Sequence, residues 1–274
     1  MHQARLPTYF LSHGAGPWSF MEGEFRRQFH KLEQSLTAVR EELGDAPKAI
    51  LIISAHWEAN GFVLSSAEKP GMIYDYSGFP EHTYHVHYRA PGSPALAHHV
   101  AELLRSGGVD ARLDPERGYD HGAFGLLKAL YPDENIPVVQ LSLDEWLEPA
   151  QHLAVGRVLT PLRDEGVLII GSGQSFQNLA LRDSRAIMPS RVFDDWLQQT
   201  LVYCSPEERR KRLVGWERAP YARIAHPGEE HLIPLMVAVG AAGDDEATCV
   251  YHDQLLGVMT ASSFRFGRLP RQGS

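Results

Sequence analysis

Short apolar runs that alternate with amphipathic stretches limit what this chain can fold into. Segments 49–57 (AILIISAHW), 136–143 (IPVVQLSL) and 166–170 (GVLII) consist almost entirely of apolar side chains. Such runs are typical of strands buried on both faces of a sheet that helices cover. A fourth strand is expected over 7–11, directly before Ser12-His13-Gly14. The runs therefore predict a central sheet enclosed by helices.

Helical periodicity occupies the segments between these strands. Apolar residues recur at three- and four-residue steps from Met21 to Leu43, and Ser93 is a good N-cap for a helix that stops at Gly107. Further helices are expected at 124–130, 150–163, 191–204 and 229–239. The alternation predicts an α/β fold with a central, mostly mixed β-sheet flanked by helices. Without a linker or internal repeat, residues 1–274 are expected to form a single domain.

Charge and composition exclude several classes of protein. The net charge is −8 and basic residues are interleaved with acidic ones, so nucleic acid is not an expected partner. No apolar run is long enough to span a membrane, and the N-terminal segment lacks a secretory signal, which predicts a cytoplasmic location. Cys204 and Cys249 form no CxxC pair and are expected to be free thiols. The 14 histidines suggest metal binding or acid/base chemistry.

Polar or aromatic turns follow three of the expected strands: Leu11-Ser12-His13-Gly14, Ser54-Ala55-His56-Trp57 and Gly171-Ser172-Gly173. Ligands of open α/β sheets bind beyond the carboxyl ends of strands, so these turns are expected to converge on one crevice. His13 and His56 would then face each other and could hold a metal ion. Taken singly, a histidine after a strand is more often a hydrogen-bonded loop or core residue, and only the repeated placement favours a metal site.

A third cluster lies at 225–231 (AHPGEEH), where Pro227-Gly228 is expected to open a helix. Two histidines plus one more histidine or carboxylate form the facial site of non-haem Fe(II) oxygenases. Either Glu230 or His231 can complete such a site. The alternative is that the acidic pair only complements the positive N-terminus of the helix. This effect alone would account for an acidic residue at position 229, without a metal site.

Two further segments carry candidate residues. Asp120 precedes His121, so it is expected either to orient this histidine as a general acid/base or to cap the following helix. The stretch 74–88 (YDYSGFPEHTYHVHY) could line a pocket for a flat aromatic ligand, or be a packed surface loop. Its three histidines are not expected to bind metal: His82, His85 and His87.

These motifs occur in an order that resembles one known family. Seven segments carry the likeness: LSHGAGPW, IISAHW, YDYSGFPEHTYHVHYRAPGSPALA, YDHGAFG, IPVVQLSLD, the GSG turn at Gly171 and HPGEEHLIPL. On these motifs, which span nearly the whole chain, the sequence resembles the class III extradiol dioxygenases of the LigB-like superfamily, of the 4,5-DOPA extradiol dioxygenase type. The resemblance implies an α/β fold with one mononuclear metal site, and an enzyme that opens a catechol ring with O₂.

The resemblance also implies roles for individual residues. It carries over His13, His56 and His231 as metal ligands and His121 as an active-site histidine near the substrate. The expected working metal is Fe(II), although Zn(II) often occupies sites of this kind in purified protein. Substrate contacts are expected from four residues in the strand-end turns and the aromatic stretch: Trp57, Tyr74, Phe79 and Ser172.

One position departs from the family pattern. The family turn usually reads GSGxxxHNL and its histidine is assigned the acid/base role, whereas this chain reads GSGQSFQNL, with Gln177 at that place. Glutamine donates and accepts hydrogen bonds but cannot shuttle a proton near pH 7. Either activity is weakened, or His121 covers the missing step.

Three functional hypotheses follow from these residues. The leading one is an Fe(II)-dependent extradiol dioxygenase that acts on a small catechol and O₂. The second is an impaired or diverged relative that binds metal and catechol without efficient turnover because of Gln177. A zinc hydrolase ranks third, since three imidazoles and an open position also suit Zn²⁺-activated water.

Overall fold

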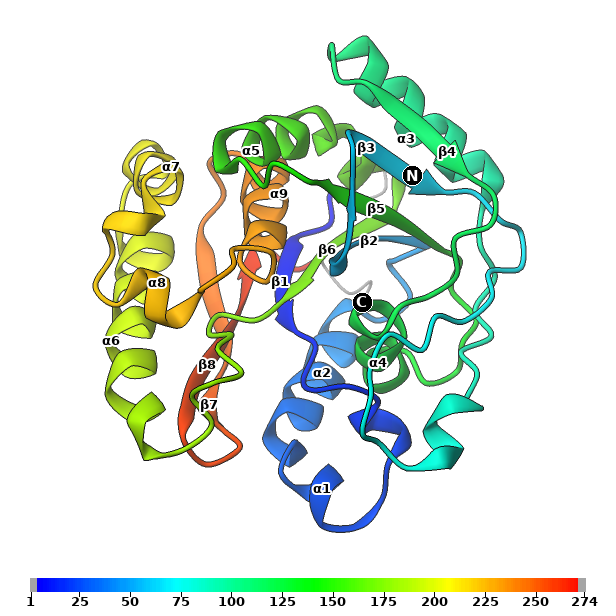
Figure 1. The fold of residues 1–274 in the computed structure, drawn as a ribbon. Coiled ribbons are helices and arrows are strands. Elements are labelled where there is room, and N and C mark those ends of the chain that lie inside the picture. Colours follow the sequence, from blue (N-terminus) through cyan, green and yellow to red (C-terminus); the bar gives the residue numbers. More distant parts are fainter. Residues whose placement is uncertain (1–3, 271–274) are drawn as a thin grey trace.

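The structure is a computed structural model that describes residues 4–270. Within this range eight strands form one mixed sheet in the order β4-β3-β5-β2-β6-β1-β8-β7 (Figure 1). The bounds of the strands are β1 Thr8–Ser12, β2 Ala49–Ala59, β3 Phe62–Ser65, β4 Ala111–Asp114, β5 Val138–Asp144, β6 Val167–Gly173, β7 Ala247–Leu255 and β8 Met259–Phe266.

The centre of the sheet is parallel. β2 pairs in parallel with β5 and β6, and β6 pairs in parallel with β1. β8 runs antiparallel to both β1 and β7, while β3 is antiparallel to β5 and parallel to β4. Ser12 lies beside Gly173, and Ser54 lies beside Ser172. The three segments expected to converge are therefore neighbours at one edge of the sheet, where ligands of open α/β sheets bind.

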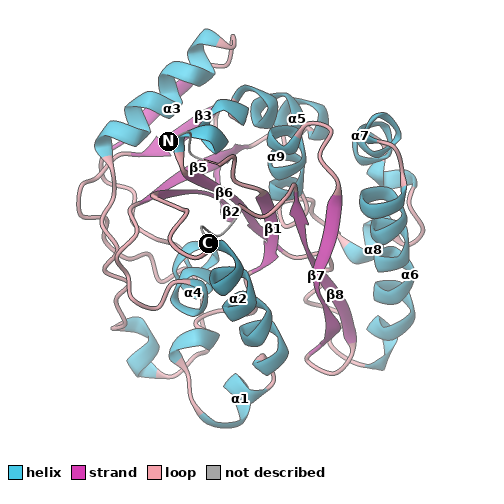
Figure 2. Cartoon of the chain, turned by 180° about the vertical axis from the view of Figure 1, so that it is seen from behind, coloured by secondary structure: helices cyan, strands magenta, loops and turns pink. Residues whose placement is uncertain are grey.

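Helices cover the sheet on both faces. Figures 1 and 2 show α6, α7 and α8 gathered beside the β7–β8 hairpin, while α1, α2 and α4 lie together elsewhere. None of the helices within residues 4–270 is both long and apolar enough to cross a membrane. Their bounds are α1 Gly23–Arg27, α2 His30–Leu43, α3 Pro94–Ser106, α4 His121–Leu130, α5 Pro149–Val158, α6 Ile187–Gln198, α7 Pro206–Val214, α8 Ala222–Ala225 and α9 Ile233–Ala242.

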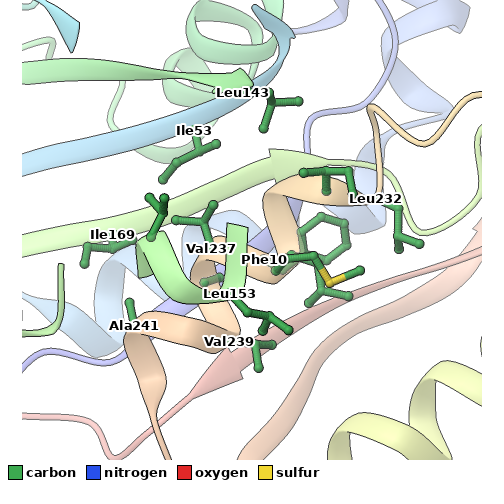
Figure 3. Close-up of a cluster of buried hydrophobic side chains, with 14 of the residues drawn as sticks. Phe10, Ile53, Leu143, Leu153, Ile169, Leu232, Val237, Val239 and Ala241 are labelled. Carbon is green, nitrogen blue, oxygen red and sulfur yellow. The ribbon is translucent and has the colours of Figure 1, made fainter. Parts of the chain in front are cut away.

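Successive side chains of the central strands enter two separate cores, because they point to opposite faces of the sheet. On one face Phe10, Ile53 and Ile169 pack with α5 and α9, including Leu153 and Val237 (Figure 3). On the other face the intervening strand residues pack with α2 and α4. This double burial explains why the central strands read as unbroken apolar runs in the sequence.

The predicted α/β fold with a mixed sheet is confirmed. The four predicted strands are present, and Ser93 caps α3 by accepting a hydrogen bond from the backbone N–H of Leu96 at 3.1 Å. The sequence did not reveal the four outer strands: β3, β4, β7 and β8. β7 is partly exposed and the others are short or lie outside the parallel centre, so their apolar signal is weak.

The helix expected from Met21 to Leu43 is interrupted between α1 and α2. Phe29 lies in the break, fully buried, and its ring stacks on Trp18 with 5.1 Å between the centroids. The contact with Trp18 is tertiary, so helical periodicity alone did not predict the interruption.

The helix expected from Glu229 begins only at Ile233. Pro234 thereby falls in its first turn, where the missing N–H of proline costs no helical hydrogen bond. A helix that began at Glu229 would have placed Pro234 in its interior. His231 therefore lies in a turn before α9 and not on the helix.

Candidate metal centre

Four histidine rings meet beside the carboxyl ends of β1 and β6. His13 follows β1, His56 lies in β2, His121 is the first residue of α4, and His231 lies in the turn before α9. The ring centroids of His56 and His121 are 3.9 Å apart, and that of His13 lies 4.9 Å from His56 and 5.2 Å from His231. The structure thus brings together the three histidines named as metal ligands and places His121 beside them.

The sequence suggested that His56 follows its strand. In the structure, however, His56 lies within β2. The strand runs on to Ala59, and its register against β5 shifts between Ile53 and Glu58. Irregularities of this kind bend a strand and re-aim its side chains, and they are frequent beside active sites. The apolar run in the sequence contains no signal for this shift.

The ring nitrogens of His13 and His56 are spaced as metal ligands are. Nε2 of His13 lies 3.3 Å from Nε2 of His56, and two nitrogens that each lie about 2.1 Å from one ion are roughly 3–3.4 Å apart. Ring nitrogens of His13, His56 and His121 all lie within 4.8 Å of one another. Nε2 of His231 is buried without a hydrogen-bond partner in the described part of the chain. Such atoms are rare in proteins, and a metal ion would satisfy this one.

His231 and His121 are the two candidates for a third ligand, and of these His121 is the one whose ring nitrogens meet the 4.8 Å spacing with both His13 and His56. Nδ1 of His231 lies 3.2 Å from Oε1 of Glu230, and Nδ1 of His121 lies 2.8 Å from Oδ1 of Asp75. In each ring Nε2 is left for another partner. Metal-binding histidines commonly have their second nitrogen held by a carboxylate in this way, so Glu230 is better placed to orient His231 than to replace it as a ligand.

Burial disfavours the charged form of three imidazoles in this cluster. It lowers the pKa of His13 and of His56 well below the usual value, and the neighbouring histidines lower both further. Burial also lowers the pKa of His231, although the contact with Glu230 opposes the shift. Because neutral imidazole is the form that binds metal ions, the lowered pKa values of these three histidines suit a cation.

Gln174 ties together the turns around the cluster. Ser12 Oγ donates to Oε1 of Gln174 at 2.5 Å, and the side-chain amide of Gln174 donates to the carbonyl of Gly14. The backbone N–H of Gln174 donates to the carbonyl of His231 at 3.0 Å. At Gly173 a Cβ atom would lie 2.1 Å from that same carbonyl oxygen, so the close approach of the two segments requires glycine.

Sequence reasoning missed Asp75, which lies in the aromatic stretch. Its Oδ1 accepts a hydrogen bond from the backbone N–H of His121 at 3.0 Å and lies 2.8 Å from the ring nitrogen Nδ1. Its Oδ2 lies 3.8 Å from Nδ1 of His56. An aspartate 46 positions away from His121 carries no local signal of this contact.

Asp120 was expected either to orient His121 or to cap the next helix, and in the structure it caps the helix. Its Oδ1 accepts a hydrogen bond from the backbone N–H of Ala123 at 3.1 Å in the first turn of α4. The same oxygen accepts from Ser54 Oγ at 2.6 Å, and Oδ2 accepts from Arg117 at 2.9 Å. The carboxylate is therefore used within the fold, and Asp75 orients the His121 ring.

The four histidines lie in the wall of a pocket of about 500 Å³. Pockets of this size hold small organic molecules. Two residues named from the sequence, Phe79 and Gln177, line the pocket with the histidines. Further apolar wall is provided by Phe25, Phe176, Leu255, Leu256 and Met259. The arrangement combines metal-binding nitrogens with a partly aromatic surface.

Three residues expected to contact substrate lie outside this pocket. The hydroxyl of Tyr74 donates to a backbone carbonyl of its own loop at 2.7 Å, and Trp57 lies under the Arg117 guanidinium at 4.6 Å from the ring centre. Ser172 Oγ donates to the carbonyl of Gly122. Contacts inside the fold hold these side chains away from the pocket. The histidines of the aromatic stretch also lie outside it: His82, His85 and His87.

The family described as the catalytic LigB subunit of aromatic ring-opening dioxygenase matches residues 7–267. The chain belongs to this family. The matched range includes all four histidines and the pocket wall. The family resemblance predicted from the seven motifs is thereby confirmed, and LigB-family membership supports a metal cofactor at the histidine cluster.

Relatives of this LigB-family chain match over nearly its whole length. It is 38% identical to "4,5-DOPA dioxygenase extradiol" of Beta vulgaris, over 94% of this chain and 96% of that protein. It is 35% identical to the protein of the same name from Escherichia coli (strain K12), over 97% of both. A solved structure of an uncharacterized protein from Escherichia coli K12 matches with a TM-score of 0.74 and 32% identity, over 96% of this chain and 100% of that one.

Proposed function

We propose that this LigB-family protein is an Fe(II)-dependent extradiol dioxygenase that opens the ring of a small catechol with O₂. The observation that carries the proposal is the convergence of His13, His56 and His231 in one pocket wall, where Nε2 of His231 is buried without a partner in the described part of the chain. Relatives named 4,5-DOPA dioxygenase extradiol support this reaction class. We also propose that residues 1–274 form one catalytic domain and that the protein acts in the cytoplasm.

In this proposal His13, His56 and His231 hold the metal, and Glu230 orients His231. Three neutral imidazoles with open positions beside them suit Fe(II). Bound iron would supply adjacent positions for catechol and O₂, and would lower the pKa of the catechol hydroxyls. Zn(II) suits the same nitrogens, so purified protein is expected to carry zinc in part of its molecules.

His121 is the group proposed to move protons. Asp75 holds its Nδ1 at 2.8 Å, so Nε2 is left to accept a proton from a catechol hydroxyl in the pocket. A ring that is held at one nitrogen and free at the other can both accept the proton and return it. The Phe79 ring in the same wall offers a flat apolar contact for the substrate ring.

Gln177 lies in the pocket where the family resemblance implies a histidine. Its amide can hydrogen-bond an oxygen of the substrate or product but cannot carry a proton. A general acid or base contributes roughly 10²–10⁴-fold to rate. We therefore propose that His121 supports turnover here at a reduced rate.

Oxygen uptake tests the proposal. Protein reconstituted with Fe(II) under nitrogen should consume one O₂ per catechol opened when it is mixed with a panel of catechols that includes DOPA. Absence of uptake in both this protein and its Gln177→His variant, with iron bound in each, would contradict it. Ester hydrolysis by zinc-loaded protein that ignores catechols would instead favour the zinc hydrolase.

The second candidate, which Gln177 favours, is a relative that binds metal and catechol without efficient turnover. Activity that arises only in Gln177→His, with unchanged metal content, would favour this candidate. Gln177→Asn is the matched control, because it keeps an amide in the same wall and should gain no activity.

A further inference from the structure

One positive charge without a partner lies in the wall of the histidine pocket. Arg182 is the only lysine or arginine among the described residues that line this pocket. It is exposed, and within residues 4–270 its guanidinium makes no hydrogen bond or ion pair. The adjacent acid, Asp183, is already bound by Arg185, whose Nη2 lies 2.8 Å from Oδ2.

No acid of the pocket neutralises Arg182. The one carboxylate among the described lining residues, Asp75, is engaged by His121. Glu230 contacts His231 and lines an adjoining cleft. The pocket therefore combines metal-binding nitrogens, an apolar wall and one free cation. A planar guanidinium binds a carboxylate as an ion pair through two parallel hydrogen bonds. A neutral amide or ester cannot form this ion pair.

We propose that Arg182 is a specificity-determining residue that selects catechols whose side chain ends in a carboxylate. This inference rests on the proposed extradiol function, because it assumes that the catechol end of the ligand binds at the histidines. A pocket of about 500 Å³ has room for a side chain beyond a single ring. Arg182 binds the end of the substrate that does not react, so it contributes to substrate affinity and takes no part in ring opening.

The test compares two ligands that differ in charge, dihydrocaffeate and its primary amide. Binding is measured by calorimetry on Fe(II)-loaded protein under nitrogen, where no turnover occurs. The unchanged protein should bind dihydrocaffeate more tightly than the amide. Arg182→Gln should weaken dihydrocaffeate binding roughly tenfold. This is at the low end of the affinity lost with a charge-assisted contact, because the site is open to solvent. Binding of the amide should not change.

Arg185→Gln is the matched control, because this arginine lies three positions away, is paired with Asp183 and does not line the pocket. It should leave the affinity for both ligands unchanged. Arg182→Lys should retain part of the preference, since it keeps the charge and loses the planar fork.

Two results would overturn the proposal for Arg182 and leave the extradiol function standing. One is equal binding of both ligands by the unchanged protein, and the other is an unaltered dihydrocaffeate affinity in Arg182→Gln. If neither ligand binds to the iron-loaded protein, the extradiol function and the role of Arg182 are both overturned.

Discussion

The carboxylate of Asp75 contacts His121 twice, at 2.8 Å from ring nitrogen Nδ1 and at 3.0 Å from the backbone N–H. The same carboxylate reaches toward His56, whose Nδ1 lies 3.8 Å from Oδ2. Asp75 thus orients one ring, fixes the start of α4 and borders a second ring of the cluster. It connects the aromatic stretch to the metal centre.

Asp75→Asn should lower kcat roughly 10- to 100-fold, the usual cost of changing a carboxylate that orients an active-site histidine. Asparagine keeps an acceptor but no negative charge, so Nε2 of His121 becomes a weaker proton acceptor. Steady-state oxygen uptake measures the effect, and iron content should stay the same. Glu81→Gln is the control, since Glu81 pairs with His85 at 3.0 Å in the same stretch but is exposed. An unchanged kcat in Asp75→Asn would show that the contact between Asp75 and His121 has no part in the reaction.

His231→Ala should weaken metal binding by more than about 100-fold, because loss of a ligand costs more than loss of a residue that only orients one. His121→Ala should bind metal nearly as well as the unchanged protein while losing activity. Competition with a chelator gives both affinities, and His82→Ala controls for loss of an exposed imidazole. The opposite pattern would assign the third ligand to His121, whose nitrogens also lie near those of His13 and His56.

Gln174→Met should lower the free energy of unfolding by about 1–3 kcal/mol, because it leaves the buried hydroxyl of Ser12 and the carbonyl of Gly14 without their partner. The turn that carries His13 would loosen, so metal affinity should fall as well. Denaturant unfolding of the metal-free protein separates the two effects. Gln151→Met, on the exposed side of α5, should be close to neutral. Equal stability of both variants would show that the Gln174 contacts contribute little.

The buried imidazole of His226 should make stability depend on pH. It lies against Phe193 and Trp216, and its Nε2 donates to the carbonyl of Ser175 at 2.9 Å. Burial lowers its pKa from 6.5 to about 3. Between these values the unfolded chain binds a proton that the folded chain does not. The free energy of unfolding therefore falls on acidification through this window, by up to roughly 1.4 kcal/mol per pH unit from this residue.

His226→Gln keeps a donor for the Ser175 carbonyl and does not titrate, so it should flatten this dependence. Urea unfolding at several pH values between about 4 and 6.5 measures the slope. His98→Gln, at an exposed position of α3, should leave the slope unchanged. A His226→Gln slope equal to that of the unchanged protein would show that another group dominates acid unfolding.

Much of the fold was predictable because its signals are local. The central strands are buried on both faces and read as apolar runs, and Ser93 marks the start of α3 by capping it. His13 could be located because it directly follows such a run. Gln177 could be recognised as a departure because the surrounding turn matches the family pattern.

The sequence by itself determined the elements of the parallel centre, the family and the histidines that could bind metal. Tertiary structure alone decided that Asp75 orients His121, that Asp120 only caps α4, and that Tyr74, Trp57 and Ser172 lie outside the pocket. The physical reason is range: periodicity and capping depend on residues a few positions apart. The direction of a side chain, by contrast, depends on which distant segment supplies its hydrogen-bond or packing partner.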